Sequence, residues 1–275
     1  MDQQELEPAG RWRGRELGSR AVSYDERDAM LYALAVGAHP VDDLDLVFER
    51  ELRVLPTFAL TLAQWAPDVL ASRGAFGDAA ALHGAQRLTV HKPLPPSGEV
   101  TCSATVAEVW DKGGAAVFDV AVDSAYFHAV WSVFAPGRGG FGGVRGPGRP
   151  SAPEQVPTHR VRLETIPAQA ALYRLTGDRH LIHIDPTAAA AIGQPRPILH
   201  GLCTLAGTAL RLADALGAHP AELAELEGRF AAPVLPGDTL DITAWQDGDR
   251  AAFEVARAGE IVLSGGRIRF QGDSA

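Results

Sequence analysis

The chain is poor in several residue types, and each shortage excludes a class of protein. Its 275 residues include two cysteines that lie far apart, so no disulfide framework is indicated. No stretch approaches the roughly 18 consecutive apolar residues that a membrane span needs. The amino-terminal residues are charged and lack the apolar core of a secretory signal peptide. We therefore expect a cytoplasmic protein that neither enters nor crosses a membrane.

Positive charge is also scarce. The formal net charge is -9, the arginines are scattered, and the lysines are Lys92 and Lys112 alone. A surface that binds a nucleic-acid backbone needs concentrated positive charge. We therefore exclude nucleic acid as a partner. A chain of this length buries roughly 70–75% of the surface that it exposes when unfolded, so it needs no metal or disulfide to hold together.

The two halves of the chain repeat one pattern. Each half has a helix-like segment with Leu-Tyr-x-Leu, then a longer apolar helix, then a Pro/Gly turn and alternating, strand-like sequence. This order predicts an α+β fold in which antiparallel strands wrap a buried helix, and two such halves could share one sheet. The matching segments are 26–36 and 167–177, 54–63 and 198–207, and the turns that begin at Pro93 and Pro233.

A Gly/Pro-rich segment without periodicity, residues 135–158, predicts a linker between the halves. We therefore divide the chain into an N-terminal repeat (1–134), this linker and a C-terminal repeat (159–275).

Three glycines of the linker, Gly137, Gly139 and Gly142, satisfy the G-x-G-x-x-G pattern of dinucleotide-binding loops. In such a loop the glycines open a helix whose N-terminus faces the pyrophosphate. Here the chain continues with GVRGPGRPSAP, which cannot begin a helix, and no Gly-Lys-Ser/Thr pair of a P-loop occurs. We therefore expect no nucleotide cofactor.

The densest group of polar residues lies at 173–186. Gly177 is expected to end the preceding helix in a left-handed conformation, and Asp185, followed by a proline, has the pattern of an N-cap. The short loop between them carries Asp178 and His183. A carboxylate and an imidazole fixed at a set separation suit acid–base catalysis.

A second element follows, in which Gly201 begins a strongly apolar helix that Gly217 is expected to end. The backbone N–H of Gly201 could bind a carbonyl oxygen that becomes negative during a reaction. An acid–base pair beside such a donor indicates proton abstraction next to a carbonyl, or its reverse. The first half lacks this arrangement at the matching place, so we expect one copy to have lost the chemistry.

These segments resemble the hydratase-2 motif of MaoC-like, double-hotdog (R)-specific enoyl-CoA hydratases. The family writes G-D-x-N-P-L-H-x-D-P, followed by P-I-L-H-G-L, and this chain has GDRHLIHIDP and PILHGL. YDERDAMLYALAVG, LHGAQRLTVHKPLPPSGEV and RFAAPVLPGDTL are also similar to family segments, so the likeness spans nearly the whole chain. It implies a double hotdog fold, an acyl-CoA or acyl-carrier-protein substrate, no cofactor, a homodimer, and an N-terminal copy that accommodates the acyl chain.

The resemblance also implies roles for individual residues. Asp178 and His183 would hold and activate the water, and Gly201 would supply the oxyanion N–H. Where the family has Asn-Pro, this chain has His180-Leu181, and we expect activity to survive because histidine can still donate or accept one hydrogen bond. The residues expected to bind the acyl thioester are His83, Gly84, Lys112, Arg179, His180 and Phe230.

Other interpretations stay open. The cluster of Asp178, His180, His183 and Asp185 permits a metal site, although Asp185 is better explained as a helix cap, so we expect no metal. A hotdog thioesterase would share the fold and the carbonyl-binding N–H. A non-catalytic acyl-thioester-binding protein is the alternative from another class. Lys112, in a turn, is as easily a solvated lysine as a contact of a CoA phosphate.

Overall fold

The computed structural model describes residues 6–76, 81–148 and 150–271. The strands of the N-terminal half are β1 (Glu16–Tyr24), β2 (Leu82–Val90), β3 (Gly98–Asp111), β4 (Ala115–Asp123) and β5 (Phe127–Pro136). Those of the C-terminal half are β6 (His159–Glu164), β7 (Leu223–Phe230), β8 (Thr239–Asp247), β9 (Arg250–Arg257) and β10 (Glu260–Phe270).

The helices that precede β2 are α1 (Glu26–Val36), α2 (Leu44–Val47), α3 (Ala59–Ala63) and α4 (Trp65–Ser72), with the 3-10 turns η1 (Ala9–Trp12) and η2 (Pro56–Phe58). Those of the C-terminal half are α5 (Gln169–Tyr173), α6 (Pro186–Ala191) and α7 (Gly201–Leu216), with η3 (Arg174–Thr176), η4 (Leu181–His183) and η5 (Pro220–Glu222).

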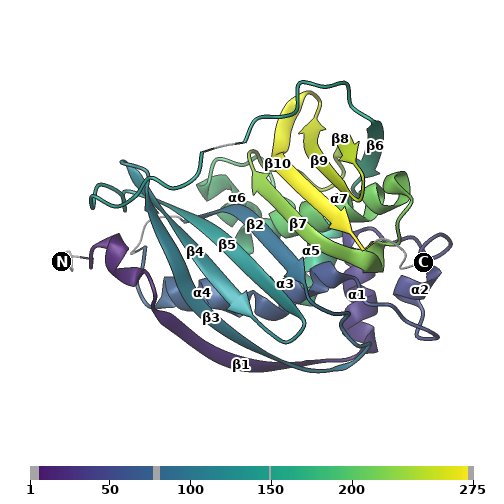
Figure 1. Ribbon diagram of the computed structural model, residues 1–275, viewed down its shortest axis with the longest axis horizontal. Helices are drawn as coiled ribbons and strands as arrows, with labels where there is room; N and C mark the ends of the chain where they lie inside the picture. Colours follow the sequence, from purple (N-terminus) through teal and green to yellow (C-terminus); the bar gives the residue numbers. More distant parts are fainter. Residues whose placement is uncertain (1–5, 77–80, 149, 272–275) are drawn as a thin grey trace.

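Over the described ranges, the ten strands form one antiparallel sheet in the order β1-β3-β4-β5-β2-β7-β10-β9-β8-β6 (Figure 1). The two halves meet where β2 pairs with β7, with Leu88 opposite Leu226 and Arg87 opposite Glu227. Counted outward from this junction, both halves have the same strand order. The prediction that two repeated halves share one antiparallel sheet is therefore confirmed.

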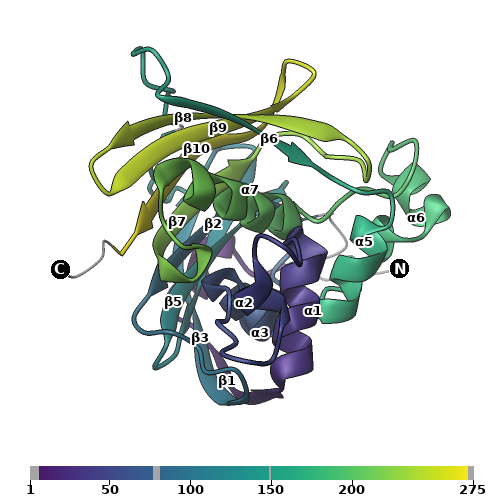
Figure 2. The ribbon, with the colours of Figure 1, turned by 90° about the vertical axis from the view of Figure 1, so that its right-hand side faces the viewer.

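The helix α7 is the buried helix that the sequence predicts. It begins at Gly201, and Gly217 closes it in the left-handed conformation with φ of +68°. Eleven of its residues are buried, among them Leu205 and Leu210, because apolar side chains recur all along it. It packs beneath the strands of the C-terminal half, while α1 lies beside α5 (Figure 2). The core therefore holds the N-terminus of α7 firmly.

The matching helix of the N-terminal half is broken, which the sequence pattern did not predict. The expected single run is divided into η2, α3 and α4, with the break at Gln64. Pro67 explains the break, because a proline has no N–H to donate to the carbonyl of Ala63 four residues earlier and its ring crowds that carbonyl.

Two expectations from composition can be compared with the structure. Cys102 and Cys203 are both unpaired and buried, as expected of small apolar side chains. Within the described residues, no helix is long and apolar enough to cross a membrane.

Candidate active site

The loop that carries the predicted acid–base pair is fixed at both ends. Asp185 caps α6 by accepting a hydrogen bond from the N–H of Thr187 at 2.8 Å, as the sequence predicts. Gly177 ends the preceding helical segment, but with φ of +150° rather than in the predicted left-handed helical conformation. A Cβ on Gly177 would lie 2.9 Å from Cγ2 of Thr61. Glycine is therefore required because the N-terminal half approaches the loop closely.

His183 ends η4 and is 8% exposed. Its Nδ1 lies 2.8 Å from the carbonyl oxygen of Ile198. Because a carbonyl only accepts, Nδ1 carries the hydrogen and Nε2 is bare in the neutral ring. Burial lowers the pKa of His183 below its usual value, which favours this neutral form. His183 therefore offers a free acceptor nitrogen.

Asp178 lies in one cluster with His183. One donor atom from each of Asp178, His183 and His200 falls within 4.8 Å of the others. The carboxylate of Asp178 accepts a hydrogen bond from the backbone N–H of His180 at 3.1 Å, and the backbone oxygen of Asp178 lies 3.1 Å from Nε2 of His200. The structure thus brings the two residues singled out in the sequence together and adds His200 to them.

The three side chains have the donor types of a metal site, but their geometry does not fit one. A bound metal lies close to the plane of each imidazole, about 2 Å from its nitrogen. The rings of His183 and His200 are stacked, with centroids 3.6 Å apart and 23° between their planes. No point within bonding distance of both rings lies in both planes. Asp185, the fourth member of the metal interpretation, is engaged as the cap of α6.

Gly201 is the first residue of α7, so its N–H is not needed inside the helix. A Cβ at this position would lie 2.8 Å from the ring of Phe230, and Phe230 in turn packs on His83, with ring centroids 4.7 Å apart. Burial lowers the pKa of His83 to about 4, so its ring is neutral near pH 7. Three residues predicted from different segments therefore meet beside the start of α7.

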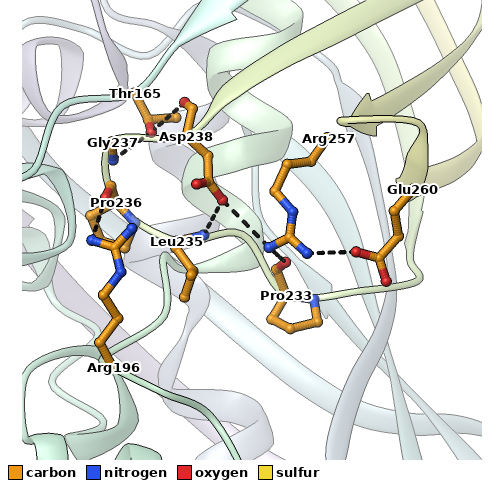
Figure 3. Close-up of polar contacts among 9 residues, drawn as sticks. All are labelled: Thr165, Arg196, Pro233, Leu235, Pro236, Gly237, Asp238, Arg257 and Glu260. Carbon is orange, nitrogen blue, oxygen red and sulfur yellow. Dashed lines mark hydrogen bonds and ion pairs between the residues drawn. The ribbon is translucent and has the colours of Figure 1, made fainter.

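The turn at Pro233–Asp238 supports the segment that leads into α7 (Figure 3). Arg196 donates to the carbonyl of Pro236 at 2.9 Å, and the N–H of Leu199 donates to Val234 at 2.7 Å. The carboxylate of Asp238 accepts from the N–H of Leu235 at 2.8 Å and pairs with Arg257. These bonds fix the position of the Ile198 carbonyl, which orients His183.

Lys112 lies in the turn between β3 and β4, as predicted. Its ammonium group donates to the backbone oxygens of Arg145 and Pro147. Its pKa is lowered, first by partial burial and then by the nearby cations of Arg229 and Arg145. Lys112, Arg145 and Arg229 therefore form a group of neighbouring cations beside the turn between β3 and β4.

The other predicted binding residues lie in two places. Gly84 sits at a break in the register between β2 and β5, where a Cβ would be 3.3 Å from the backbone oxygen of Ser132. Arg179 and His180 are exposed in the loop that carries Asp178 and His183. Nδ1 of His180 accepts from the N–H of Ile182 at 3.5 Å, so this histidine caps η4.

Backbone amides of the Gly-rich linker bind the carboxylate of Asp111. Backbone N–H groups of Gly113, Gly140, Gly142 and Gly143 all point at the carboxylate of Asp111, at 2.8–3.3 Å. These bonds, that of Gly140 first, lower the pKa of Asp111 to about 2. Of the three glycines in the G-x-G-x-x-G pattern, Gly142 donates to this internal carboxylate, so its amide is occupied without a nucleotide.

Two cavities lie away from the acid–base pair. One of about 370 Å³ borders Trp110 and Phe141, and one of about 140 Å³ borders Phe270. Neither is lined by Asp178 or His183.

Sequence reasoning missed His200, Ile198 and the two arginines near Lys112. Ile198 acts through its backbone, which no residue type reveals. His200 was visible in the sequence, directly before Gly201 in Ile-Leu-His-Gly, and a polar residue at the start of an apolar helix was the available signal.

Comparison with known proteins finds a family match for each half of the chain. A family model described as the MaoC like domain matches residues 149–264, and one described as the MFE-2 hydratase 2 N-terminal domain matches residues 22–134. The chain is 38% identical to the enoyl-CoA hydratase ChsH3 of Mycobacterium tuberculosis, over 92% of this chain and 95% of that protein. It is 37% identical to the 3-hydroxyacyl-thioester dehydratase Y of the same organism, over 90% and 93%. The crystal structure of a MaoC-like dehydratase from Phytophthora capsici superposes with a TM-score of 0.83 at 25% identity, covering 95% and 97% of the two chains.

Proposed function

Because the chain belongs to the MaoC-like dehydratase family, with an N-terminal half of the MFE-2 hydratase 2 type, we propose that it is a hydro-lyase acting on acyl thioesters. It adds water to a trans-2-enoyl-CoA to give the (R)-3-hydroxyacyl-CoA, and it catalyses the reverse reaction without a cofactor. The observation that carries this proposal is the bare Nε2 of buried His183 in one cluster with the Asp178 carboxylate.

In the hydration direction, Asp178 and His183 hold one water between them. As the water oxygen attacks Cβ of the enoyl group, its proton passes to the pair, and the pair delivers a proton to Cα. In the product, the hydroxyl of the water is on Cβ and a hydrogen has been added to Cα. Each acid–base partner of this kind contributes roughly 10²- to 10⁴-fold to the rate.

After water has attacked Cβ and before Cα is protonated, the thioester oxygen carries negative charge. We assign the stabilisation of this oxygen to the N–H of Gly201, at the positive end of α7. The assignment is supported by the ring of Phe230, which leaves no room for a side chain at this position. Removing an oxyanion donor costs about 3–4 kcal/mol of transition-state stabilisation in known cases.

The carrier of the acyl group is proposed to be CoA. The cations of Lys112, Arg145 and Arg229 would meet its phosphates, and His83, Gly84 and Phe230 would line the path from these cations to the start of α7. Arg179 and His180 would contact the same ligand from the exposed edge of the catalytic loop. An acyl-carrier protein presents one phosphate on its prosthetic arm, so it would use fewer of these charges.

The N-terminal half is proposed to accommodate the acyl chain. At the place that matches the catalytic loop it has the sequence GAHPVDD, and Asp43 there accepts a hydrogen bond from the backbone N–H of His39 at 2.7 Å. Asp43 is thereby used to close its own loop. Asp43 is also buried and pairs with Arg211 at 3.9 Å, which supports the loss of catalysis in this copy.

The proposal is tested by following the loss of enoyl-thioester absorbance with crotonyl-CoA and with a longer enoyl-CoA, and then by chiral analysis of the product. We expect the (R)-3-hydroxyacyl-CoA. Asp178→Asn and His183→Ala should nearly abolish turnover while leaving the fold intact by circular dichroism. Wild-type rates in either variant would refute the assignment of the pair.

The same assay separates the other two interpretations of the sequence. A thioesterase would release free CoA, which thiol titration detects during turnover. A protein that only binds acyl thioesters would show binding with no change of absorbance. The proposal also includes a homodimer in the cytoplasm, which sedimentation of the purified chain and fractionation of cells would check.

A further inference from the structure

One buried side chain beside the acid–base pair has no part in the proposed reaction. His200, 1% exposed, is the residue directly before α7. Its ring stacks on that of His183, with centroids 3.6 Å apart, and its Nε2 lies 3.1 Å from the backbone oxygen of Asp178. One side chain therefore contacts both members of the pair, and its backbone continues directly into Gly201.

The hydrogen-bond partner of His200 determines its protonation. A carbonyl oxygen only accepts, so Nε2 carries the hydrogen. Burial, and next the neighbouring His183, hold the pKa of His200 well below its usual value, and Asp178 and Arg174 are the other charged groups that act on it. The ring is therefore neutral.

A second aromatic ring also packs on His200. Tyr173 packs on it with centroids 4.7 Å apart, and Tyr32 of the N-terminal half packs on Tyr173 at 5.9 Å. Both tyrosines are at most 1% exposed. They are the tyrosines of the repeated Leu-Tyr-x-Leu segments, and they meet because α1 and α5 lie side by side (Figure 2). The stack thus connects the pair to the other half of the molecule.

We propose that His200 is a positioning residue, which fixes the ring of His183 by stacking and the backbone of Asp178 by a hydrogen bond, with Tyr173 and Tyr32 as its support. The inference rests on the proposed function, since it assigns these two residues as the pair that acts on water. Through Tyr32, the N-terminal half, which carries no acid–base pair, also helps to position His200.

Packing alone does not account for a histidine at this place. Nδ1 of His200 is buried and has no hydrogen-bond partner among the residues that the structure describes. A buried polar atom without a partner is unfavourable, and an apolar ring of similar size would avoid this cost. What such a ring lacks is the N–H that reaches Asp178. The hydrogen bond and the stacking together require an imidazole.

The test uses three variants of the full chain, which separate the two contacts. His200→Phe keeps a ring over His183 and removes the hydrogen bond, His200→Gln keeps a donor and removes the ring, and His200→Ala removes both. Small displacements of catalytic groups can cost on the order of 100-fold in rate. We expect kcat to fall by about 10-fold in the first two and about 100-fold in the third, with KM changed less than about 3-fold.

The pH dependence of kcat gives a readout that a purely structural role would not move. Without the covering ring, His183 is better solvated, so its lowered pKa rises toward the usual value. In His200→Ala the loss of hydration activity on acidification should therefore begin at higher pH than in the wild type. His200→Phe keeps the cover and should keep the wild-type midpoint.

Phe253→Leu is the matched control, because Phe253 is an equally buried aromatic residue in the sheet of the same half. It should lower the melting temperature and leave kcat per folded molecule unchanged. Tyr32→Leu should lower kcat several-fold, while Tyr32→Phe should not. Wild-type kcat per folded molecule in His200→Phe and His200→Gln would overturn the proposal, whether or not His200→Ala folds.

A second measurement keeps this inference apart from the proposed function. NMR titration of the His183 ring needs no turnover, so it remains informative if the wild type fails to hydrate enoyl-CoA. An upward shift of the His183 midpoint in His200→Ala, or in His200→Gln if the alanine variant does not fold, supports the positioning role. An unchanged midpoint contradicts it.

Discussion

Backbone carbonyls determine which ring nitrogens carry hydrogen in this site. Each of its three buried or half-buried histidines faces a carbonyl oxygen at hydrogen-bond distance, so one nitrogen is a donor and the other is bare. Burial then keeps the rings neutral. A sequence shows the histidines but not the carbonyls, so it could not say which nitrogen of which ring is free. The pairs are His183 with Ile198, His200 with Asp178, and His83 with Ala85.

The lowered pKa values predict how stability depends on pH. A histidine whose folded pKa is lowered favours the folded state fully above its unfolded pKa of about 6.5, and this contribution is lost as the pH falls toward the folded value. Burial lowers the pKa of His83 to about 4 and also lowers that of His183. The free energy of unfolding, measured with urea, should therefore decrease between about pH 6.5 and 4. In His83→Phe this decrease should be smaller, and an identical slope would contradict the assignment.

Gly201 is the residue at which one added methyl group should be most harmful to activity. In Gly201→Ala the new Cβ would meet the ring of Phe230 at 2.8 Å, so the ring or the start of α7 must move. We expect kcat/KM for enoyl-CoA hydration to fall at least about 10-fold. Gly207→Ala is not a suitable control, because its Cβ would meet the backbone oxygen of Val36 at 2.9 Å. Gly217→Ala, where no atom lies within 4 Å, should affect stability and leave kcat/KM unchanged.

At the scale of elements, local residue chemistry was a good guide wherever a helix starts or stops. The cap at Asp185 and the end of α7 at Gly217 were predicted correctly, because a cap depends on a few neighbouring residues. The conformation of Gly177 was predicted wrongly, because its surroundings include Thr61 of the other half, which no local sequence pattern reveals. The apolar spacing predicts one continuous helix in the N-terminal half. It gives no sign of the break, which is caused by Pro67.

The turn at Pro233–Asp238 should matter to catalysis through its support of Ile198. Asp238→Ala removes the hydrogen bond to the N–H of Leu235 and the pairing with Arg257. We expect a loss of about 1–3 kcal/mol in unfolding free energy and a several-fold lower kcat. Asp241→Ala is the matched control, since Asp241 and Arg162 form an exposed pair, and it should change stability by less than about 0.5 kcal/mol. Equal effects in the two variants would exclude the support role.

At the scale of the whole molecule, the repeat in the sequence predicted the architecture better than any single motif. Leu-Tyr-x-Leu occurs twice, and the structure places both tyrosines in contact across the two halves. The linker at 135–158 stays a prediction. One family model ends at residue 134 and the other begins at residue 149, so most of the predicted linker lies between them. The pairing of β2 with β7 could not be derived from composition, because strand partners depend on the packing of the whole sheet.

The shared sheet predicts that neither half is self-sufficient. A chain of residues 159–275 would expose the edge of β7 that β2 covers and the surface of α5 that α1 covers. Exposed strand edges promote association. We expect this fragment to be inactive and to sediment as an oligomer or aggregate, whereas the full chain with a protease site inserted in the linker should stay folded after cleavage. A monomeric, well-folded fragment would contradict this expectation.

The matching strand orders on the two sides of β2 and β7 have an evolutionary consequence. In an assembly of two identical subunits, every substitution appears in both copies. A change that adapts one copy would therefore also alter the copy that carries the acid–base pair. Joining both copies in a single polypeptide removes this coupling. Selection can then reshape α3 and α4 while the Asp-His loop near α7 stays unchanged.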